Sequence, residues 1–103
     1  MYKIMLCCAA GMSTSLLVTK MQKAAEAQGI EAKIWAVGAN EAKENGKDAD
    51  VVLLGPQVRY LEKTVKAEVA PTPAALIDMK AYGKMDGEAV LKMAMDMIAE
   101  AGK

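Results

Sequence analysis

Histidine and phenylalanine are both absent from this chain of 103 residues. Without histidine, the polypeptide cannot form a Ser/His/Asp or Cys/His nucleophile system or carry a phosphoryl group on its own imidazole. Zinc is disfavoured as well, because the two cysteines, Cys7 and Cys8, are adjacent and cannot supply the four nitrogen or sulfur ligands of a structural site. We therefore expect neither a metal nor another cofactor.

Excess charge of one sign is also missing, and aromatic residues are few. The 13 basic and 13 acidic side chains are interspersed and give a formal net charge of +0. Binding to nucleic acid requires a concentrated cationic face, often with aromatic residues that stack on bases. We expect no nucleic-acid partner.

No apolar run is long enough for a membrane span. Lys20, Gly55 and Asp78 interrupt the apolar stretches before they reach the roughly 18 to 20 residues that a span requires. An early lysine followed by apolar residues resembles a signal peptide, but a strand followed by a glycine-containing loop explains this segment better. Adjacent cysteines cannot crosslink distant segments, so a reducing cytoplasm is the favoured location.

The length and a hydrophobic content of 53% fit one domain, residues 1–103. The apolar patterns predict strands over 3–7, 31–37, 51–54 and 74–78, the second at a sheet edge and the third buried on both faces. They predict helices over 16–28, 58–69 and from 86 onward, a helical turn over 41–47 and a loop over 82–87. This order predicts an α/β fold: a four-stranded parallel sheet with helices on both faces, a flavodoxin-like or phosphatase-like three-layer sandwich.

The spacing of apolar residues predicts which side of each helix is buried. The expected buried positions are Leu17, Met21, Ala24, Ala25 and Gln28 in the first helix, Val58, Leu61, Val65 and Val69 in the second, and Val90, Met93, Met97 and Ile98 in the last. We interpret the nine methionines as core residues that replace phenylalanine. Met12 is the exception, because an exposed side chain there could contact a partner.

Cys8 lies where the first strand ends. It is followed by Ala9-Ala10-Gly11-Met12-Ser13-Thr14-Ser15 and then by a helix. Backbone N–H groups and the positive end of the helix dipole at such a position bind phosphate and favour a thiolate, so Cys8 is a candidate nucleophile and phosphoryl acceptor. This hypothesis expects an accessible sulfur surrounded by loop amides. Cys7, inside the strand, is interpreted as a small buried hydrophobic residue.

Several other residues are considered around the same edge of the sheet. Ser13, Thr14 and Ser15 are interpreted as a helix N-cap, a role compatible with phosphate contact. Gly55, Pro56 and Gln57 follow the third strand, and Tyr82 precedes the last helix, so we expect all four at the rim of the site. Arg59 is interpreted as a solvated helix position rather than an anion ligand. Asp86 is interpreted as an N-cap rather than a general acid.

Three segments carry a family resemblance: Cys8-Ala-Ala-Gly-Met-Ser-Thr-Ser-Leu-Leu-Val, Ala49-Asp-Val-Val-Leu-Leu-Gly-Pro-Gln57 and Tyr82-Gly-Lys-Met-Asp-Gly87. Together they resemble the IIB component of the lactose/cellobiose/chitobiose family of the bacterial sugar phosphotransferase system, essentially from end to end. The resemblance implies that Cys8 accepts a phosphoryl group from a phosphohistidine on a IIA protein. It also implies transfer to a sugar, expected to be a β-linked disaccharide, bound by the membrane component IIC. The amides from Ala10 through Ser15 would then form the phosphate cradle.

Two alternatives remain open. The loop also resembles that of low-molecular-weight tyrosine phosphatases, which use Cys-x5-Arg, but Thr14 stands at the arginine position here. A hydroxyl stabilises a phosphoryl group less than a bidentate guanidinium does, so a phosphocysteine should hydrolyse slowly. A phosphatase-like or arsenate-reductase-like enzyme would turn over an aryl phosphate without a partner. A flavodoxin-like nucleotide or flavin binder would show bound-cofactor absorbance.

Overall fold

The computed structural model describes residues 1–8, 15–38 and 41–102. In chain order the elements alternate between strands and helices, as the sequence predicts. They are β1 (Tyr2–Cys8), α1 (Ser15–Ala27), β2 (Ala32–Gly38), α2 (Ala42–Asn45), the 3-10 turn η2 (Gly46–Asp48), β3 (Val51–Leu54), the 3-10 segment η3 (Pro56–Leu61), α3 (Glu62–Val69), β4 (Ala74–Leu76), α4 (Met79–Gly83) and α5 (Gly87–Glu100).

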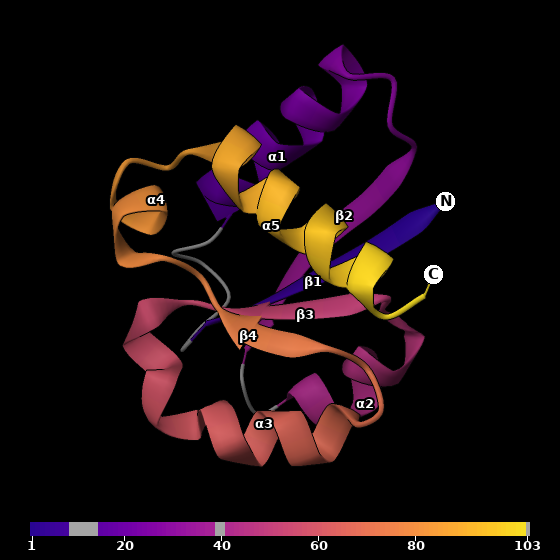
Figure 1. Cartoon of the computed structure of the whole chain (residues 1–103). Helices are drawn as coiled ribbons and strands as arrows, with labels where there is room; N and C mark the ends of the chain where they lie inside the picture. The colour runs from indigo at the N-terminus through magenta and orange to yellow at the C-terminus, as the bar shows by residue number, and fades with distance from the viewer. Residues whose placement is uncertain (9–14, 39–40, 103) are drawn as a thin grey trace.

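The four strands form one parallel sheet in the order β2-β1-β3-β4 (Figure 1). Strand β2 lies at one edge, which confirms the prediction from its alternating pattern, and β3, whose residues are all buried, lies inside the sheet. From β1 the chain first forms β2 on one side of β1, and it then crosses over to form β3 on the other side. The carboxyl ends of β1 and β3 therefore flank the point at which the strand order reverses, where ligands of such sheets bind.

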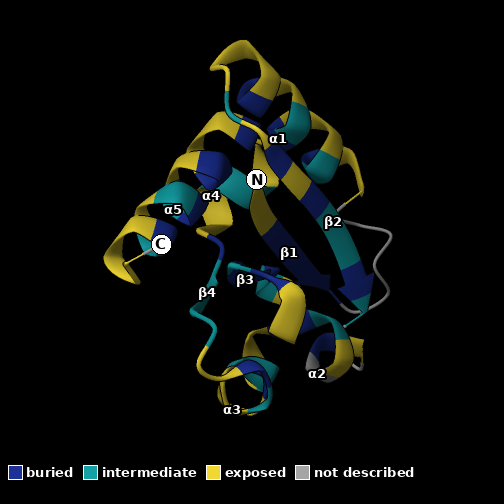
Figure 2. Ribbon diagram, turned by 90° about the vertical axis from the view of Figure 1, so that its right-hand side faces the viewer, coloured by how far each residue is buried: buried dark blue, intermediate teal, exposed yellow. Residues whose placement is uncertain are grey.

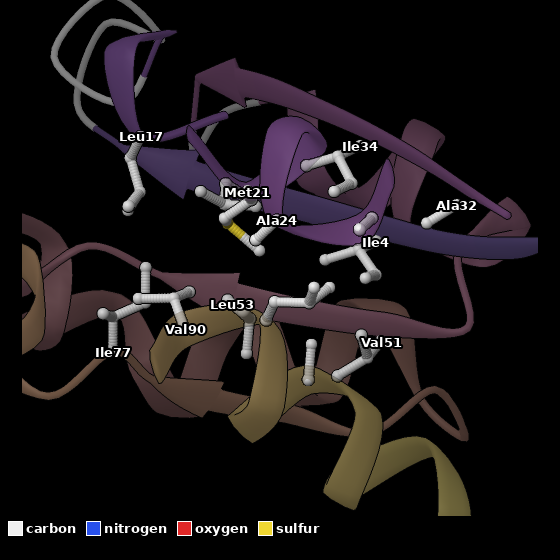
Figure 3. Packing of buried hydrophobic residues seen from close by; sticks show 14 of the residues in the cluster. Ile4, Leu17, Met21, Ala24, Ala32, Ile34, Val51, Leu53, Ile77 and Val90 are labelled. Carbon is white, nitrogen blue, oxygen red and sulfur yellow. The ribbon is translucent and has the colours of Figure 1, made fainter. Parts of the chain in front are cut away.

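Helices cover both faces of the sheet (Figure 1). Alternate residues of β1 point to opposite faces, so Ile4 and Leu6 pack toward α1 and α5, whereas Met5 and Cys7 pack toward α2 and α3. Figure 3 shows the first of these two cores, with Met21 of α1 and Val90 of α5 closing over β1 and β3. The predicted three-layer arrangement is thus confirmed.

The burial of the helices matches the predicted faces with three differences (Figure 2), one of which is that Leu61 is half-buried rather than buried. Helix α1 buries the four expected positions Leu17, Met21, Ala24 and Ala25 but ends at Ala27, so Gln28 is exposed. Helix α5 buries Val90, Leu91, Ala94 and Ile98 together with Gly87, and Met93 and Met97 only flank the core. The stripe of α5 is rotated toward Leu91 and Ala94 because these small and branched residues pack directly against the sheet and α1.

Three predicted boundaries were wrong. Residues 58–69 do not form one helix, because Pro56 starts a 3-10 segment in which Val58 is non-helical (φ −113°, ψ 23°), and the α-helix begins only at Glu62. The last strand ends at Leu76 rather than at 78. Residues 79–83 form the short helix α4, which Asp78 caps by accepting a hydrogen bond from the N–H of Ala81 at 3.3 Å. Tyr82 therefore lies on a helix, not in a loop.

Candidate functional site

Cys8 is the last residue of β1 and lies at the carboxyl edge of the sheet. It is in register with Gly38 of β2, and the preceding residue, Cys7, is in register with Leu54 of β3. Because side chains alternate along a strand, Cys8 points to the face that Leu6 shares with α1, and Cys7 points to the opposite face. The two neighbouring thiols therefore lie in different environments.

The Cys8 side chain is fully buried, with 0% of its surface exposed. The expectation of an accessible sulfur is thus wrong for this conformation. The predicted loop residues Ala9, Ala10, Gly11, Met12, Ser13 and Thr14 lie outside the described residues, so their part in a phosphate cradle remains a prediction.

Cys7 is buried in the core between β1, β3 and α3, which confirms its interpretation as a small hydrophobic residue. Burial, followed by the negative charges of Cys8 and Glu68, raises the pKa of the Cys7 thiol from 9.0 to about 12. At neutral pH this thiol is protonated. It is a poor nucleophile because the reactive form of cysteine is the thiolate.

Helix α1 begins at the edge where Cys8 lies. Ser15 is its first residue, and the Thr19 hydroxyl donates a hydrogen bond to the Ser15 carbonyl at 3.2 Å. A right-handed crossover from β1 to its parallel neighbour β2 runs the helix back toward the amino edge. The N-terminus of α1, which is the positive end of the helix dipole, is therefore on the Cys8 side of the sheet.

The structure brings the predicted rim residues together at the carboxyl edge of the sheet. The N–H of Gly55 donates to the carbonyl of Cys7 at 2.8 Å, which continues the β1–β3 pairing to the end of the sheet. The side-chain amide of Gln57 donates to the hydroxyl of Tyr82 at 2.6 Å and joins the segment after β3 to α4. Pro56 lies between Gly55 and Gln57, begins the 3-10 segment η3 and is half-buried. All four rim residues thus follow the carboxyl ends of β3 and β4.

Arg59 and Asp86 have the surroundings that the sequence predicts. Arg59 is exposed on η3, in line with its interpretation as a solvated position. The Asp86 carboxylate accepts a hydrogen bond from the N–H of Ala89 at 3.1 Å, so Asp86 is the N-cap of α5 as predicted.

Three exposed apolar side chains at this edge were not recognised in the sequence. Leu16, Tyr60 and Met79 are 53%, 76% and 67% exposed and lie in the first elements that follow β1, β3 and β4. We call these three residues the apolar rim. An apolar residue on the outward side of a predicted helix, such as Leu16, was the signal that could have identified them.

These features define a small parallel α/β protein with a cysteine at the end of its first strand. A family model described as "PTS system, Lactose/Cellobiose specific IIB subunit" matches residues 3–93. The chain belongs to this family of the bacterial sugar phosphotransferase system, which confirms the resemblance found in the sequence.

Relatives match the chain over almost its whole length. The oligo-β-mannoside-specific EIIB component of Bacillus subtilis (strain 168) is 46% identical over 100 residues, 95% of this chain and 97% of the relative. The galactose-specific EIIB component of Lactococcus lactis subsp. cremoris (strain MG1363) is 45% identical over 102 residues, 92% of this chain and 94% of the relative. The solution structure of a cellobiose-specific IIB component from Borrelia burgdorferi has a TM-score of 0.81 and 38% identity, covering 96% of this chain and 93% of that one.

Among the described residues, no helix combines the length and the apolar character needed to cross a membrane.

Proposed function

We propose that this IIB component works in the cytoplasm as a phosphocysteine carrier. In this proposal Cys8 accepts a phosphoryl group from a phosphohistidine of a IIA protein and passes it to a sugar bound by the membrane component IIC. The observation that supports the proposal best is the position of Cys8, at the carboxyl end of β1 and on the side of the sheet where α1 begins. Backbone N–H groups and a helix N-terminus at such a position stabilise a phosphoryl group.

The proposed reaction consists of two displacements at phosphorus. First, the Cys8 thiolate attacks the phosphorus of the phosphohistidine; the S–P bond forms, the P–N bond breaks, and the electron pair of that bond stays on the imidazole. Next, a sugar hydroxyl attacks the phosphocysteine; the O–P bond forms, the S–P bond breaks with its electron pair on the Cys8 thiolate, and the proton of the hydroxyl passes to water. Positioning and electrostatic stabilisation supply most of the catalysis in such transfers.

The burial of Cys8 adds a condition to this proposal. Attack on phosphorus requires direct contact, so the sulfur, which has no exposed surface, has to be uncovered when the donor binds. The same burial has an advantage for a carrier, because a site that excludes water protects a reactive intermediate from hydrolysis. Thr14, at the position of the phosphatase arginine, acts in the same direction, since a hydroxyl gives no bidentate stabilisation of the hydrolytic transition state.

The sugar is assigned only as a class. The Bacillus subtilis relative is named for oligo-β-mannosides and the Lactococcus lactis relative for galactose, although both share nearly the same identity with this chain. We therefore keep the β-linked disaccharide as the proposed substrate and leave the choice of sugar to the membrane component.

Phosphotransfer with purified proteins tests the proposal. The chain is mixed with a cognate IIA protein loaded from phosphoenolpyruvate through the general components, and intact mass and peptide mapping locate the phosphoryl group. We expect modification of Cys8 in the wild-type chain and in Cys7→Ser, and none in Cys8→Ser. Labelling of Cys7, unchanged labelling of Cys8→Ser, or turnover of an aryl phosphate without a partner would overturn the proposal.

A further inference from the structure

A cleft lies far from Cys8, between the amino-terminal half of β1 and β2 and the α2–η2 segment. It has a volume of about 430 Å³, and its lining residues are Lys3, Lys33, Trp35, Asn45 and Asp48. Lys3 precedes Cys8 by five positions on the same strand, which places the two residues ~17 Å apart at the usual rise of a strand. The cleft is therefore separate from the proposed phosphoryl-transfer site.

The cleft contains charges of both signs. Lys3 and Lys33 line it together with Asp48, and the Asp50 carboxylate accepts a hydrogen bond from the backbone N–H of Lys3 at 2.9 Å. Lys3 and Lys33 are direct partners in the β1–β2 register and belong to the same face of the sheet as Met5 and Cys7. Neither lysine forms an ion pair with another described residue, whereas Lys66 pairs with Glu62 on α3. Two like charges held side by side on adjacent strands repel each other. An anion bound between them would relieve this repulsion.

The remaining lining residues offer an aromatic surface and hydrogen-bonding groups. The ammonium of Lys33 lies 5.5 Å from the ring centroid of Trp35, a distance at which a cation is attracted to the face of an aromatic ring. The Asn45 side-chain amide donates to the carbonyl of Glu41 at 3.0 Å, so its orientation is fixed. Asp48 is exposed on η2 and contributes a carboxylate that accepts hydrogen bonds from hydroxyl groups.

We propose that this cleft binds a phosphorylated sugar. The phosphate lies between the ammonium groups of Lys3 and Lys33, a sugar ring packs against Trp35, and sugar hydroxyls hydrogen-bond to Asn45 and Asp48. Free phosphate would use the lysines alone and would lack the contacts of the sugar with Trp35, Asn45 and Asp48. A neutral sugar would leave the two lysines unmatched. The volume is within the range of about 300 to 1,000 Å³ that is typical of small-molecule sites.

The binding step does not depend on the proposed carrier function. It requires only the residues of the cleft, and it is measured without IIA, IIC or phosphotransfer. A chain that fails to accept a phosphoryl group on Cys8 would still bind the ligand, and the reverse also holds. The two proposals can therefore fail separately.

The fluorescence of Trp35 provides a direct measurement, because it is the only tryptophan of the chain. We expect a saturable change in its emission on titration with cellobiose 6-phosphate, and at least about tenfold weaker binding of inorganic phosphate and of cellobiose. Cys8→Ser should bind cellobiose 6-phosphate as the wild-type chain does. Binding that is lost in Cys8→Ser would assign the ligand to the other site and overturn the proposal.

Charge substitutions test the assignment of the phosphate. Lys3→Gln and Lys33→Gln should each weaken binding of cellobiose 6-phosphate about tenfold, the effect of losing one charge-assisted contact. Lys92→Gln, on the exposed side of α5, is the matched control and should leave binding unchanged. Urea unfolding and the two-dimensional NMR spectrum establish that each variant is folded. The absence of saturation, equal binding of inorganic phosphate, or equal weakening in Lys92→Gln would refute the proposal.

Discussion

Gln57 and Tyr82 form a hydrogen bond of 2.6 Å at the rim of the candidate site, with the amide of Gln57 as donor and the hydroxyl of Tyr82 as acceptor. The two residues are 25 positions apart and follow two different strands, β3 and β4. The bond therefore fixes α4 relative to the 3-10 segment η3, and both elements lie at the edge where β1 ends with Cys8. The bond thus links the segments that follow two neighbouring strands.

We predict that Tyr82→Phe slows phosphoryl transfer to Cys8 while it lowers the free energy of unfolding only slightly. The substitution removes only the hydroxyl, and an exposed neutral hydrogen bond contributes about 0.5–1.5 kcal/mol to the free energy of unfolding. Stopped-flow or quench-flow transfer from a phosphorylated IIA protein measures the rate, and urea unfolding measures the stability. Tyr2→Phe, at the opposite end of β1, is the control. Equal transfer rates in the wild-type chain and Tyr82→Phe would show that the bond does not position the rim.

Gly87 provides a prediction on stability. It is buried where the N-terminus of α5 meets α1, and a Cβ atom there would lie 2.5 Å from the carbonyl carbon of Lys20 and 2.7 Å from the backbone nitrogen of Met21. These are backbone atoms, so the helices would have to separate. We expect Gly87→Ala to lower the free energy of unfolding by about 1–3 kcal/mol, as measured by urea denaturation.

Gly83→Ala is the matched control for this prediction. Gly83 ends α4, and no atom lies within 4 Å of the position that its Cβ would take. We expect Gly83→Ala to leave stability unchanged or to raise it by about 0.4–1 kcal/mol, because alanine reduces the conformational freedom of the unfolded chain. If both substitutions had the same effect, the close contact between α1 and α5 would not explain the burial of Gly87.

The central part of the fold was predictable from the sequence, because strands buried on both faces carry a continuous apolar signal. Val51 to Leu54 is such a strand, and β1 and the edge strand β2 were also placed correctly. Helix α4 was missed because five residues are too few to show helical periodicity. The Asp78 side chain caps this helix, but an aspartate after a strand is also common in turns, so it does not by itself predict a helix.

The sequence predicted that Cys8 lies at the end of the first strand, but it did not predict that the Cys8 side chain is buried. A strand that ends at Cys8 before a helix could be recognised from the order of residues alone. The burial of the Cys8 side chain depends on what packs over the strand end, which is a tertiary property. Likewise, Lys3 and Lys33 are 30 positions apart, and only the register of β1 with β2 brings them together.

Cys7 predicts a loss of stability at alkaline pH. Its pKa is raised by burial to about 12 in the folded chain from 9.0 in the unfolded one, so the unfolded chain loses this proton first as the pH rises. The stabilisation is therefore complete below pH 9 and is lost between pH 9 and 12, at a slope of about 1.4 kcal/mol per pH unit. Urea unfolding across this range measures the slope.

The control for the alkaline experiment is Cys7→Ala. This variant is less stable at neutral pH because it leaves a cavity in the core, but it lacks the titrating thiol. Lysines and tyrosines titrate in both chains, so the difference between the two slopes isolates Cys7. Parallel slopes would contradict the raised pKa.

The apolar rim leads to a prediction about the partner that covers the Cys8 edge. Among the described residues, Leu16, Tyr60 and Met79 are exposed apolar side chains that follow three carboxyl strand ends, and in the proposed transfer a phosphoryl donor reaches this edge. Interface energy concentrates in a few apolar and aromatic residues, each of which contributes about 1–2 kcal/mol or more. We expect Tyr60→Ala to weaken binding of the phosphorylated IIA protein about tenfold, as measured by the concentration dependence of the transfer rate.

The same experiment distinguishes docking from catalysis. If Tyr60 contributes only to docking, saturating donor should restore the maximal transfer rate of Tyr60→Ala to that of the wild-type chain. Tyr2→Ala removes an exposed aromatic side chain at the amino edge and should change neither parameter. A reduced maximal rate with unchanged half-saturation would mean that Tyr60 acts on the reacting groups instead. An effect of equal size in Tyr2→Ala would show that the donor approaches the sheet from a different side.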